Sequence, residues 1–183
     1  RVLVEVDTGM HRCGVAPGQA ALDLALRIMD LRGLRFEGLM GYEGHAVMIP
    51  DMAERTRVTQ EALAALVGTR DLLTQHGVGV SIVSGGGTGT YTITGNYPGV
   101  TEVQAGSDAT MDTKYRQVGT GGEAEFERAL TVLARVISTP TPDVAIIDAG
   151  MKSMTHEFGM PTVMRPEGWA LARLSEEHGS LRR

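Results

Sequence analysis

The chain has 183 residues and a net charge of −5 with no basic block, which argues against a nucleic-acid-binding surface. Its 24 glycines and few aromatic residues are typical of a loop-rich α/β enzyme rather than of a coiled coil or a disordered tail. A single cysteine, Cys13, allows no intrachain disulfide, so we expect a reducing cytoplasm. The sequence contains no apolar run of membrane-spanning length and no signal peptide, and we expect no membrane partner.

Apolar periodicity predicts strands and helices in strict alternation over the first two thirds of the chain. We expect strands over residues 2–7, 36–42 and 78–83 and the start of a fourth at 101, with helices over 19–31 and 52–76. Nine apolar residues are predicted to face inward from the helices: Leu22, Ala25, Leu26, Met29, Ala62, Leu63, Leu66, Leu72 and Leu73. Gly77 is predicted to end the second helix in the left-handed conformation. This alternation predicts parallel βαβ units.

The alternation ends at about residue 123. Residues 126–138 fit both a helix and a strand, whereas residues 144–148 are clearly a strand. Because a proline-containing turn at 139–143 separates them, a β-hairpin is the preferred interpretation. Residues 168–183 allow no firm prediction. We therefore expect two domains, an α/β part over residues 1–125 and a β-rich part over residues 126–183.

A glycine-rich segment, residues 84–90, reads Ser-Gly-Gly-Gly-Thr-Gly-Thr and follows the third predicted strand. Its glycines permit positive φ and expose backbone N–H groups, which can form a nest of donors for a phosphate. The hydroxyls of Thr88 and Thr90 would add donors at the same place. The alternative interpretation is a flexible connection between a strand and a helix. The segment is not a P-loop, because no lysine follows its last glycine.

Polar segments also follow the other predicted strands, at residues 8–14, 42–45 and 106–108. Ligands of parallel α/β proteins gather at the carboxyl ends of the strands, so we expect these segments to form one site. The glycine-rich segment and Gly106–Ser107 follow consecutive strands, as do the loops that hold a phosphate in many barrels. This arrangement favours phosphate binding.

Three side chains in these segments are candidates for direct roles. Arg12 would face the site as a fixed cation, unless it pairs with an acid of its own loop. Tyr42 would either stack on a planar ligand or close the core. His45 is the best-placed general base, with a surface histidine as the alternative. Lys114 and Lys152 are poorly placed against the glycine-rich segment, and no HxH, HExxH or CxxC motif predicts a metal site.

Five motifs occur in the order of one enzyme family and cover nearly the whole chain. They are VLVEVDTGMHRCG (2–14), GLMGYEGH (38–45), VSGGGTGT (83–90), TEVQAGS (101–107) with Met111-Asp112, and IIDAG (146–150). Together they resemble the D-threonine aldolase / D-serine dehydratase-like branch of the alanine-racemase-type, fold type III, pyridoxal-phosphate enzymes. The resemblance implies the second half of a (β/α)8 TIM-type barrel followed by the start of a β-rich domain. It also implies that the chain is part of a longer enzyme or is completed by another chain.

The resemblance assigns roles to the candidate residues. Arg12 would meet the pyridine nitrogen of pyridoxal 5'-phosphate and, because an arginine keeps its proton, would leave that nitrogen unprotonated. Tyr42 would line the cofactor pocket. The phosphate would be held by Thr88, Gly89, Thr90, Gly106 and Ser107. Asp108 stands where members of this branch commonly have an aromatic residue, and its carboxylate would have to turn away from the phosphate.

The chemistry of this branch uses a histidine base, a divalent metal and a Schiff-base lysine. His45 is the nearest match for the base, with Met48 as a competing position, whereas the lysine and the metal ligands are expected outside this segment. The resemblance implies a lyase that splits D-threonine-like D-β-hydroxy amino acids into glycine and an aldehyde. Alternatives are a D-serine dehydratase, a non-catalytic pyridoxal-phosphate homeostasis barrel and a barrel that binds a phosphosugar. A homodimer is left open.

Overall fold

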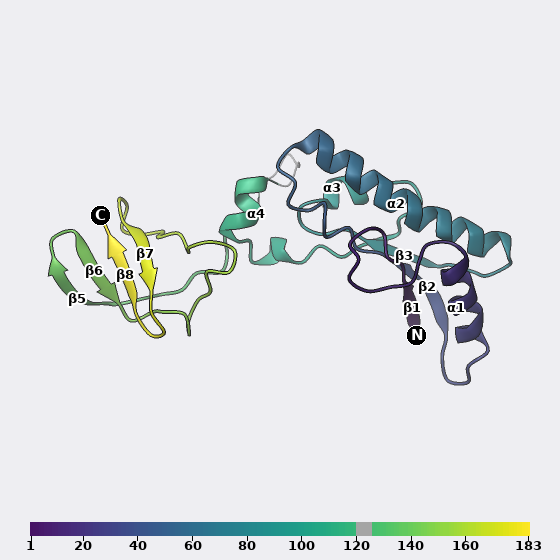
Figure 1. Cartoon of the computed structure of the whole chain (residues 1–183), viewed down its shortest axis with the longest axis horizontal. Helices are drawn as coiled ribbons and strands as arrows, with labels where there is room; N and C mark the ends of the chain where they lie inside the picture. The colour runs from purple at the N-terminus through teal and green to yellow at the C-terminus, as the bar shows by residue number, and fades with distance from the viewer. Residues whose placement is uncertain (120–125) are drawn as a thin grey trace. The chain divides into compact units, whose positions relative to one another are not determined.

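The structure, a computed structural model, describes residues 1–119 and 126–183 of the chain (Figure 1). These residues form two compact units. The first contains Arg1–Ala109 and the described residues of 118–126, and the second contains Thr110–Gln117 and Glu127–Arg183. Each unit holds one four-stranded sheet. The domain boundary predicted near residue 125 falls on residues 120–125, outside the described residues.

The sheet of the first unit is parallel, as the alternation predicts. Its strands are β1 (Val2–Glu5), β2 (Phe36–Met40), β3 (Ile82–Gly85) and β4 (Glu102–Val103), and they lie side by side in that order. The third strand begins four residues later than predicted. Val78 is already buried against the preceding helix, where its amide donates to the Leu73 carbonyl, so the ladder starts only at Ile82. Ser84 and Gly85 therefore belong to the strand and not to the turn.

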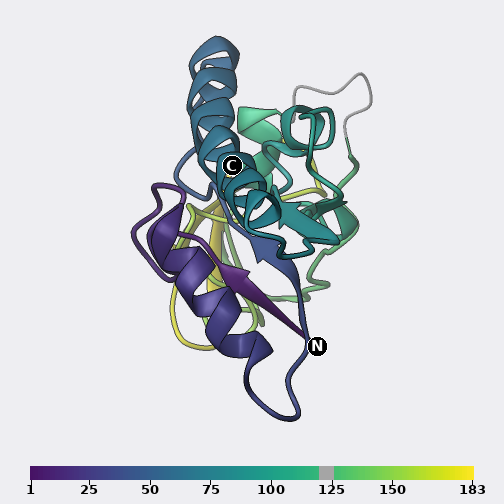
Figure 2. The ribbon, with the colours of Figure 1, turned by 90° about the vertical axis from the view of Figure 1, so that its right-hand side faces the viewer.

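Two helices cover the parallel sheet. Helix α1 (Gln19–Met29) packs on β1 and β2, and α2 (Met52–Gln75) packs on β2, β3 and α1; Figure 2 shows the two helices side by side. The Asp51 carboxylate caps α2 by accepting from the Glu54 amide at 2.8 Å, and Gly77 follows the helix with the predicted positive φ of 76°. No helix in the described parts of the chain has both the length and the apolar character needed to cross a membrane.

The inward face of α1 differs from the prediction. Leu22 and Ala25 are buried as expected, but Leu26 and Met29 are exposed, with Ala21 completing the buried face instead. The buried face of α1 thus runs along Ala21, Leu22 and Ala25, and Leu26 and Met29 lie outside it. On α2, Leu72 is partly buried and the other predicted core residues are buried: Ala62, Leu63, Leu66 and Leu73.

The described residues also contain three short helices: α3 (Tyr91–Thr94) after β3, the 3-10 helix η1 (Ser107–Ala109) after β4, and α4 (Thr113–Val118). The second unit is an antiparallel sheet in the order β5-β6-β8-β7. Its strands are β5 (Val136–Thr141), β6 (Val144–Ile147), β7 (Ala170–Leu174) and β8 (Gly179–Arg182).

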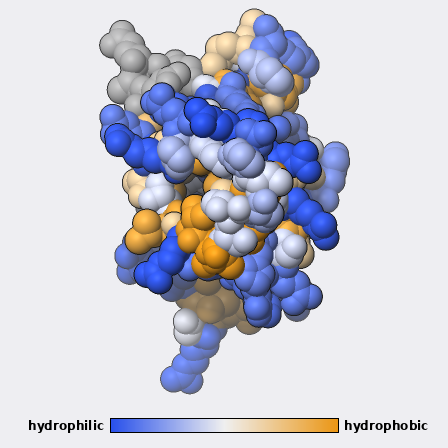
Figure 3. Space-filling view, turned by 90° about the vertical axis from the view of Figure 1, so that its left-hand side faces the viewer, coloured by the Kyte–Doolittle hydropathy of each residue, from blue (hydrophilic) through white to orange (hydrophobic). Residues whose placement is uncertain are grey.

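The predicted β-hairpin is confirmed, because β5 and β6 pair across a turn at Pro142-Asp143. The first strand of the hairpin begins later than expected, because residues 126–135 form neither helix nor strand. It also extends further, since β5 includes part of the predicted turn. The core of this unit is small and consists of Ala145, Ile147, Ala149, Leu171 and Leu181. On the face that Figure 3 displays, apolar side chains gather near the centre among hydrophilic ones.

Candidate functional site

The carboxyl ends of the four parallel strands lie at one edge of the sheet, and each of the segments predicted to carry the site follows one of them. Three contacts between these segments are direct. Arg12 after β1 meets Tyr42 after β2, Tyr42 meets Gly87 after β3, and Thr88 meets Asp108 after β4. The structure therefore brings together all four segments that the sequence analysis singled out.

The loop after β1 is shaped by Asp7. One carboxylate oxygen accepts from the amides of Gly9 and His11, each at 3.0 Å, and the other lies 3.0 Å from His11 Nδ1. Hydrogen bonds from the amides of His11 and then Gly9, followed by that from the His11 ring, lower the pKa of Asp7 to about 2. The loop closes back on its own strand through Val15, whose amide donates to the Glu5 carbonyl at 2.9 Å. Arg12 is thus presented from a short, internally bonded loop.

Arg12 and Tyr42 form a pair. The guanidinium carbon lies 5.6 Å from the centroid of the Tyr42 ring, within the range of a cation–π contact. No ion pair joins Arg12 to an acid in the described part of the chain, and Asp7, the acid of its own loop, is occupied by His11. The alternative in which Arg12 pairs within its loop is therefore not what the structure shows.

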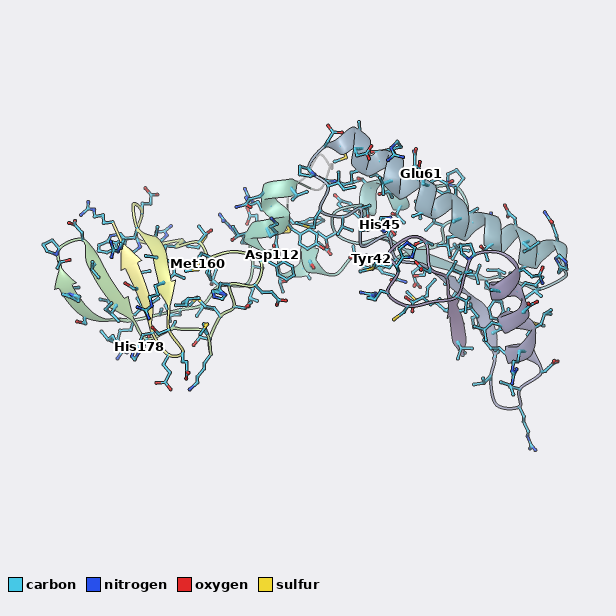
Figure 4. The ribbon with its side chains drawn as sticks, in the orientation of Figure 1. Tyr42, His45, Glu61, Asp112, Met160 and His178 are labelled. Atoms are coloured by element: carbon cyan, nitrogen blue, oxygen red, sulfur yellow. The ribbon has the colours of Figure 1, made fainter. Side chains whose placement is uncertain are left out.

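The Tyr42 ring also packs against the glycine-rich segment. A Cβ atom added to Gly87 would lie 3.0 Å from ring atom Cε2 and 3.2 Å from the hydroxyl oxygen, so a larger residue at 87 would push the ring away. His45 is exposed, and its ring lies against the loop after β1, where a Cβ on Gly9 would come within 3.3 Å of Nε2 (Figure 4). Among the described residues, none makes a hydrogen bond to the His45 ring, so its nitrogens are open to an incoming ligand.

Glu43, which the sequence analysis did not identify, lies beneath the glycine-rich segment with only 1% of its surface exposed. Its Oε1 accepts from the hydroxyls of Thr90 and Thr94, each at 2.7 Å, and its Oε2 accepts from the Gly86 amide at 3.1 Å. Thr90 also accepts from the Gly87 amide at 3.1 Å. In this structure the Thr90 hydroxyl is buried and donates to Glu43, whereas the sequence analysis expected it to donate to the ligand.

The amides of Thr88 and Gly89 donate to no described residue, and the same holds for those of Gly106 and Ser107. The two turns that carry them are joined through Thr88. Its hydroxyl accepts from the Asp108 amide at 3.0 Å and donates to the Asp108 carboxylate at 3.3 Å. The Asp108 carboxylate thus contacts the Thr88 hydroxyl. Two neighbouring turns together offer four backbone donors, with one carboxylate beside them.

A second residue missed by sequence reasoning is Arg55 of α2, which is fully buried. Its guanidinium donates to the carbonyls of Gly89 at 3.1 Å, Gly119 at 2.8 Å and Val118 at 3.0 Å, and its Nε donates to the Ile49 carbonyl at 2.7 Å. Burial lowers the pKa of this guanidinium. Arg55 stands between Glu54 and Arg57, whose side chains pair on the exposed face of α2, so nothing in its sequence neighbourhood distinguishes it.

Neither lysine belongs to the unit that holds these turns. Lys114 and Lys152 both lie in the second unit, where Lys152 donates to Glu177 at 2.9 Å. No group of three or more His, Cys, Asp or Glu side chains in residues 1–119 and 126–183 is arranged to hold a metal ion.

Comparison with known proteins gives two family matches. Residues 1–114 match "Alanine racemase, N-terminal domain", and residues 129–183 match "Putative serine dehydratase domain". The chain is 39% identical to a D-threonine aldolase of Arthrobacter sp., over 99% of this chain and 48% of that protein. It is 32% identical to a 3-hydroxy-D-aspartate aldolase of Paracoccus denitrificans, over 97% of this chain and 47% of that protein.

Among solved structures, the D-threonine aldolase from Filomicrobium marinum superposes with a TM-score of 0.94 and 36% identity, over 99% of this chain and 49% of that one. The chain thus spans about half the length of the relatives it matches. The resemblance inferred from the five motifs is confirmed. The chain belongs to the family of the alanine racemase N-terminal domain, among the fold type III pyridoxal-phosphate proteins.

Proposed function

We propose that this chain is part of a pyridoxal-phosphate-dependent lyase acting on D-configured β-hydroxy amino acids, with retro-aldol cleavage of D-threonine-like substrates as its reaction. The names of its relatives, D-threonine aldolase and 3-hydroxy-D-aspartate aldolase, support this substrate class. One structural observation carries the proposal: four unpartnered backbone amides on two neighbouring turns lie on the same sheet edge as the Arg12–Tyr42 pair.

The residues present fit the cofactor. Backbone amides suit a phosphate dianion because several N–H dipoles can point at it at once. We assign this contact to Thr88, Gly89, Gly106 and Ser107, and we assign Thr90 the role of fixing the turn through Glu43. When bound, the cofactor would draw electrons from the substrate's α-carbon, which both cleavage and elimination need.

Arg12, Tyr42 and His45 would complete the site. The Arg12 guanidinium would donate to the pyridine nitrogen and, since it does not give up its proton, keep that nitrogen unprotonated. Tyr42 would line the pocket while holding Arg12 in place through the cation–π contact. A ring nitrogen of His45 would take the proton of the substrate's β-hydroxyl as the bond between the α- and β-carbons breaks.

We further propose that the four parallel strands form the second half of a (β/α)8 barrel and that the antiparallel sheet begins a β-rich domain. The strict alternation of strands and helices and the half-length match to the relatives support this assignment. A Schiff-base lysine and the ligands of a divalent metal would then be supplied from outside this segment. A cytoplasmic location is consistent with an exposed free thiol at Cys13, and a homodimer stays a proposal.

Dehydration of D-serine to pyruvate and ammonia is the second candidate. The match of residues 129–183 to "Putative serine dehydratase domain" favours it specifically. In that reaction the β-hydroxyl departs instead of losing its proton to a base, so His45 would face a leaving group. A non-catalytic homeostasis barrel is less favoured, because the chain continues into a second unit with its own sheet.

Product analysis of the complete protein separates these functions. With pyridoxal phosphate and a divalent metal present, D-threonine should yield glycine and acetaldehyde in equal amounts, while L-threonine stays intact. Pyruvate from D-serine without aldehyde from D-threonine would instead establish the dehydratase. Cofactor binding without either product would leave only the carrier function.

A further inference from the structure

Two buried charged side chains flank the turn of residues 86–90, and neither takes part in the proposed chemistry. Glu43 bonds Gly86 and Thr90, Arg55 bonds Gly89, and both side chains are essentially without exposed surface. Burying a charge is costly unless hydrogen bonds compensate, so each arrangement calls for a physical account.

Glu43 is surrounded by neutral donors only. Its three hydrogen bonds come from the hydroxyls of Thr90 and Thr94 and from the Gly86 amide, and no cationic side chain in the described part of the chain pairs with it. Because the carboxylate is covered by these groups, it is not available to touch a ligand. Its contacts all run to the turn and to the short helix that follows.

These bonds restrain a segment that would otherwise be flexible. Glycine reaches more backbone conformations than other residues, and four of the six residues 84–89 are glycines. Glu43 holds Gly86 directly and Gly87 through the Thr90 hydroxyl, and Arg55 holds the carbonyl of Gly89 at 3.1 Å. The Thr90 amide also donates to the Gly87 carbonyl at 3.0 Å, which holds the peptide group that carries the Thr88 amide. The peptide group that carries the Gly89 amide then lies between two restrained ones, so both amides are oriented before any ligand arrives.

We propose that Glu43 is a positioning residue for the phosphate group of the cofactor: it orders the turn so that the amides of Thr88 and Gly89 need no rearrangement on binding. Preorganisation of this kind raises affinity by removing the entropic cost of ordering the turn. The inference rests on the proposed function, since it presupposes that the phosphate of pyridoxal phosphate binds at this turn.

The substitution Glu43→Gln tests this role with little change in shape. A carboxamide offers one acceptor oxygen and one NH2 group. In one orientation the NH2 faces the Gly86 amide, which can only donate, and in the other the threonine hydroxyls must turn from donors into acceptors, so either orientation disturbs the bonds to the turn. Glu37→Gln is the matched control, because Glu37 is also a buried carboxylate, 6% exposed, in the strand that precedes Glu43, and its partners Arg1 and Arg35 lie outside the turn. Thr94→Val is a milder second variant that removes one donor to Glu43 without altering residues 86–90.

The readout is the ratio of dissociation constants for pyridoxal and pyridoxal phosphate, measured by equilibrium dialysis on the complete protein. This ratio isolates the phosphate contribution, because the two probes differ only in that group. We expect the ratio to fall about tenfold in Glu43→Gln, as for the loss of one hydrogen bond to a charged group, while affinity for pyridoxal stays unchanged. Glu37→Gln should keep the wild-type ratio even if its melting temperature drops.

The possible results distinguish a failure of the positioning role of Glu43 from a failure of the proposed phosphate site. A wild-type protein that binds both probes equally would overturn the proposed phosphate site itself. A wild type that prefers the phosphorylated probe, together with a folded Glu43→Gln of unchanged ratio, would overturn the positioning role alone. If circular dichroism shows that Glu43→Gln does not fold, Thr94→Val decides: a reduced ratio supports the role, and the wild-type ratio contradicts it.

Discussion

Two buried carboxylates near opposite ends of β2 are held in different ways. Glu37, at the amino end, pairs with the guanidinium groups of Arg1, at 2.9 Å, and Arg35. Glu43, just beyond the carboxyl end, accepts only from hydroxyls and an amide. The charge of Glu37 is balanced by two arginines at the amino end of the strand. Glu43 has no cationic partner among the described residues, and its hydrogen bonds from neutral donors hold a turn in shape. This difference agrees with the proposed site at the carboxyl end of the sheet.

The predictions below test that division. Changes to Arg12, His45 or Asp108 at the carboxyl end of the sheet should alter ligand binding or turnover with little effect on stability. Changes at the amino end should alter stability with little effect on the ligand.

The largest effect is expected for His45→Ala. Because the ring is exposed and makes no hydrogen bond with the described residues, folding should be unaffected, while loss of a general base lowers turnover by about 10²–10⁴-fold. Turnover is measured with D-threonine, and cofactor retention by absorbance. His178→Ala, an exposed histidine of the second unit, is the control (Figure 4). Full activity of His45→Ala would move the base to another residue.

Arg12→Ala should weaken retention of pyridoxal phosphate by about tenfold to a hundredfold and change its spectrum. The change removes both the cation–π contact to Tyr42 and the proposed hydrogen bond to the pyridine nitrogen. Arg12→Lys keeps the charge but not the planar group, so it should restore retention only in part. A spectrum and an affinity identical to wild type would place Arg12 outside the site.

Asp108→Asn should tighten binding of pyridoxal phosphate by roughly threefold to tenfold, because it removes a negative charge beside the amides assigned to the phosphate. The asparagine oxygen can still accept from the Thr88 hydroxyl, so the link between the two turns is kept. Dialysis at low and high salt checks the electrostatic origin, since the gain should shrink as salt screens the repulsion. Equal affinities at low salt would show that this carboxylate does not face the phosphate.

Glu37→Gln should have the smallest effect and act on stability alone. Hydrogen bonds from Arg1 and then Arg35 lower the pKa of Glu37 to about 2, from 4.5. A depressed pKa stabilises the fold above about pH 4.5, and that stabilisation is lost as the pH falls toward 2. Urea midpoints of variant and wild type should therefore differ at pH 7 and converge near pH 2. A constant difference across this range would contradict the ion-pair account.

Much of the fold could be predicted because it follows from local periodicity. The long helix that Gly77 follows comes from periodicity within a few residues, and the parallel strands follow from the alternation of such segments along the chain. The late start of β3 could not be predicted from the sequence. Val78 would be apolar in a strand or against a helix, and its amide donates to the Leu73 carbonyl instead of to a neighbouring strand. The exposure of Leu26 reflects packing against the rest of the unit rather than its own sequence.

Part of the candidate site could also be predicted from the sequence, and part could not. Its segments could be predicted since each follows a strand, and Arg12, Tyr42 and His45 belong to recognisable motifs. Glu43 and Arg55 could not be predicted, because charged residues are usually exposed and their partners lie far along the chain. Glu43 bonds residues more than 40 positions away, and Arg55 bonds the carbonyls of Gly89 and Gly119.

A crystal structure of the complete protein with pyridoxal phosphate tests the central claim most directly. The account predicts phosphate oxygens within about 2.7–3.2 Å of the backbone nitrogens of the turns at 88–89 and 106–107, with the Glu43 carboxylate still bonded to Thr90. A phosphate bound elsewhere, with both turns empty, would contradict it.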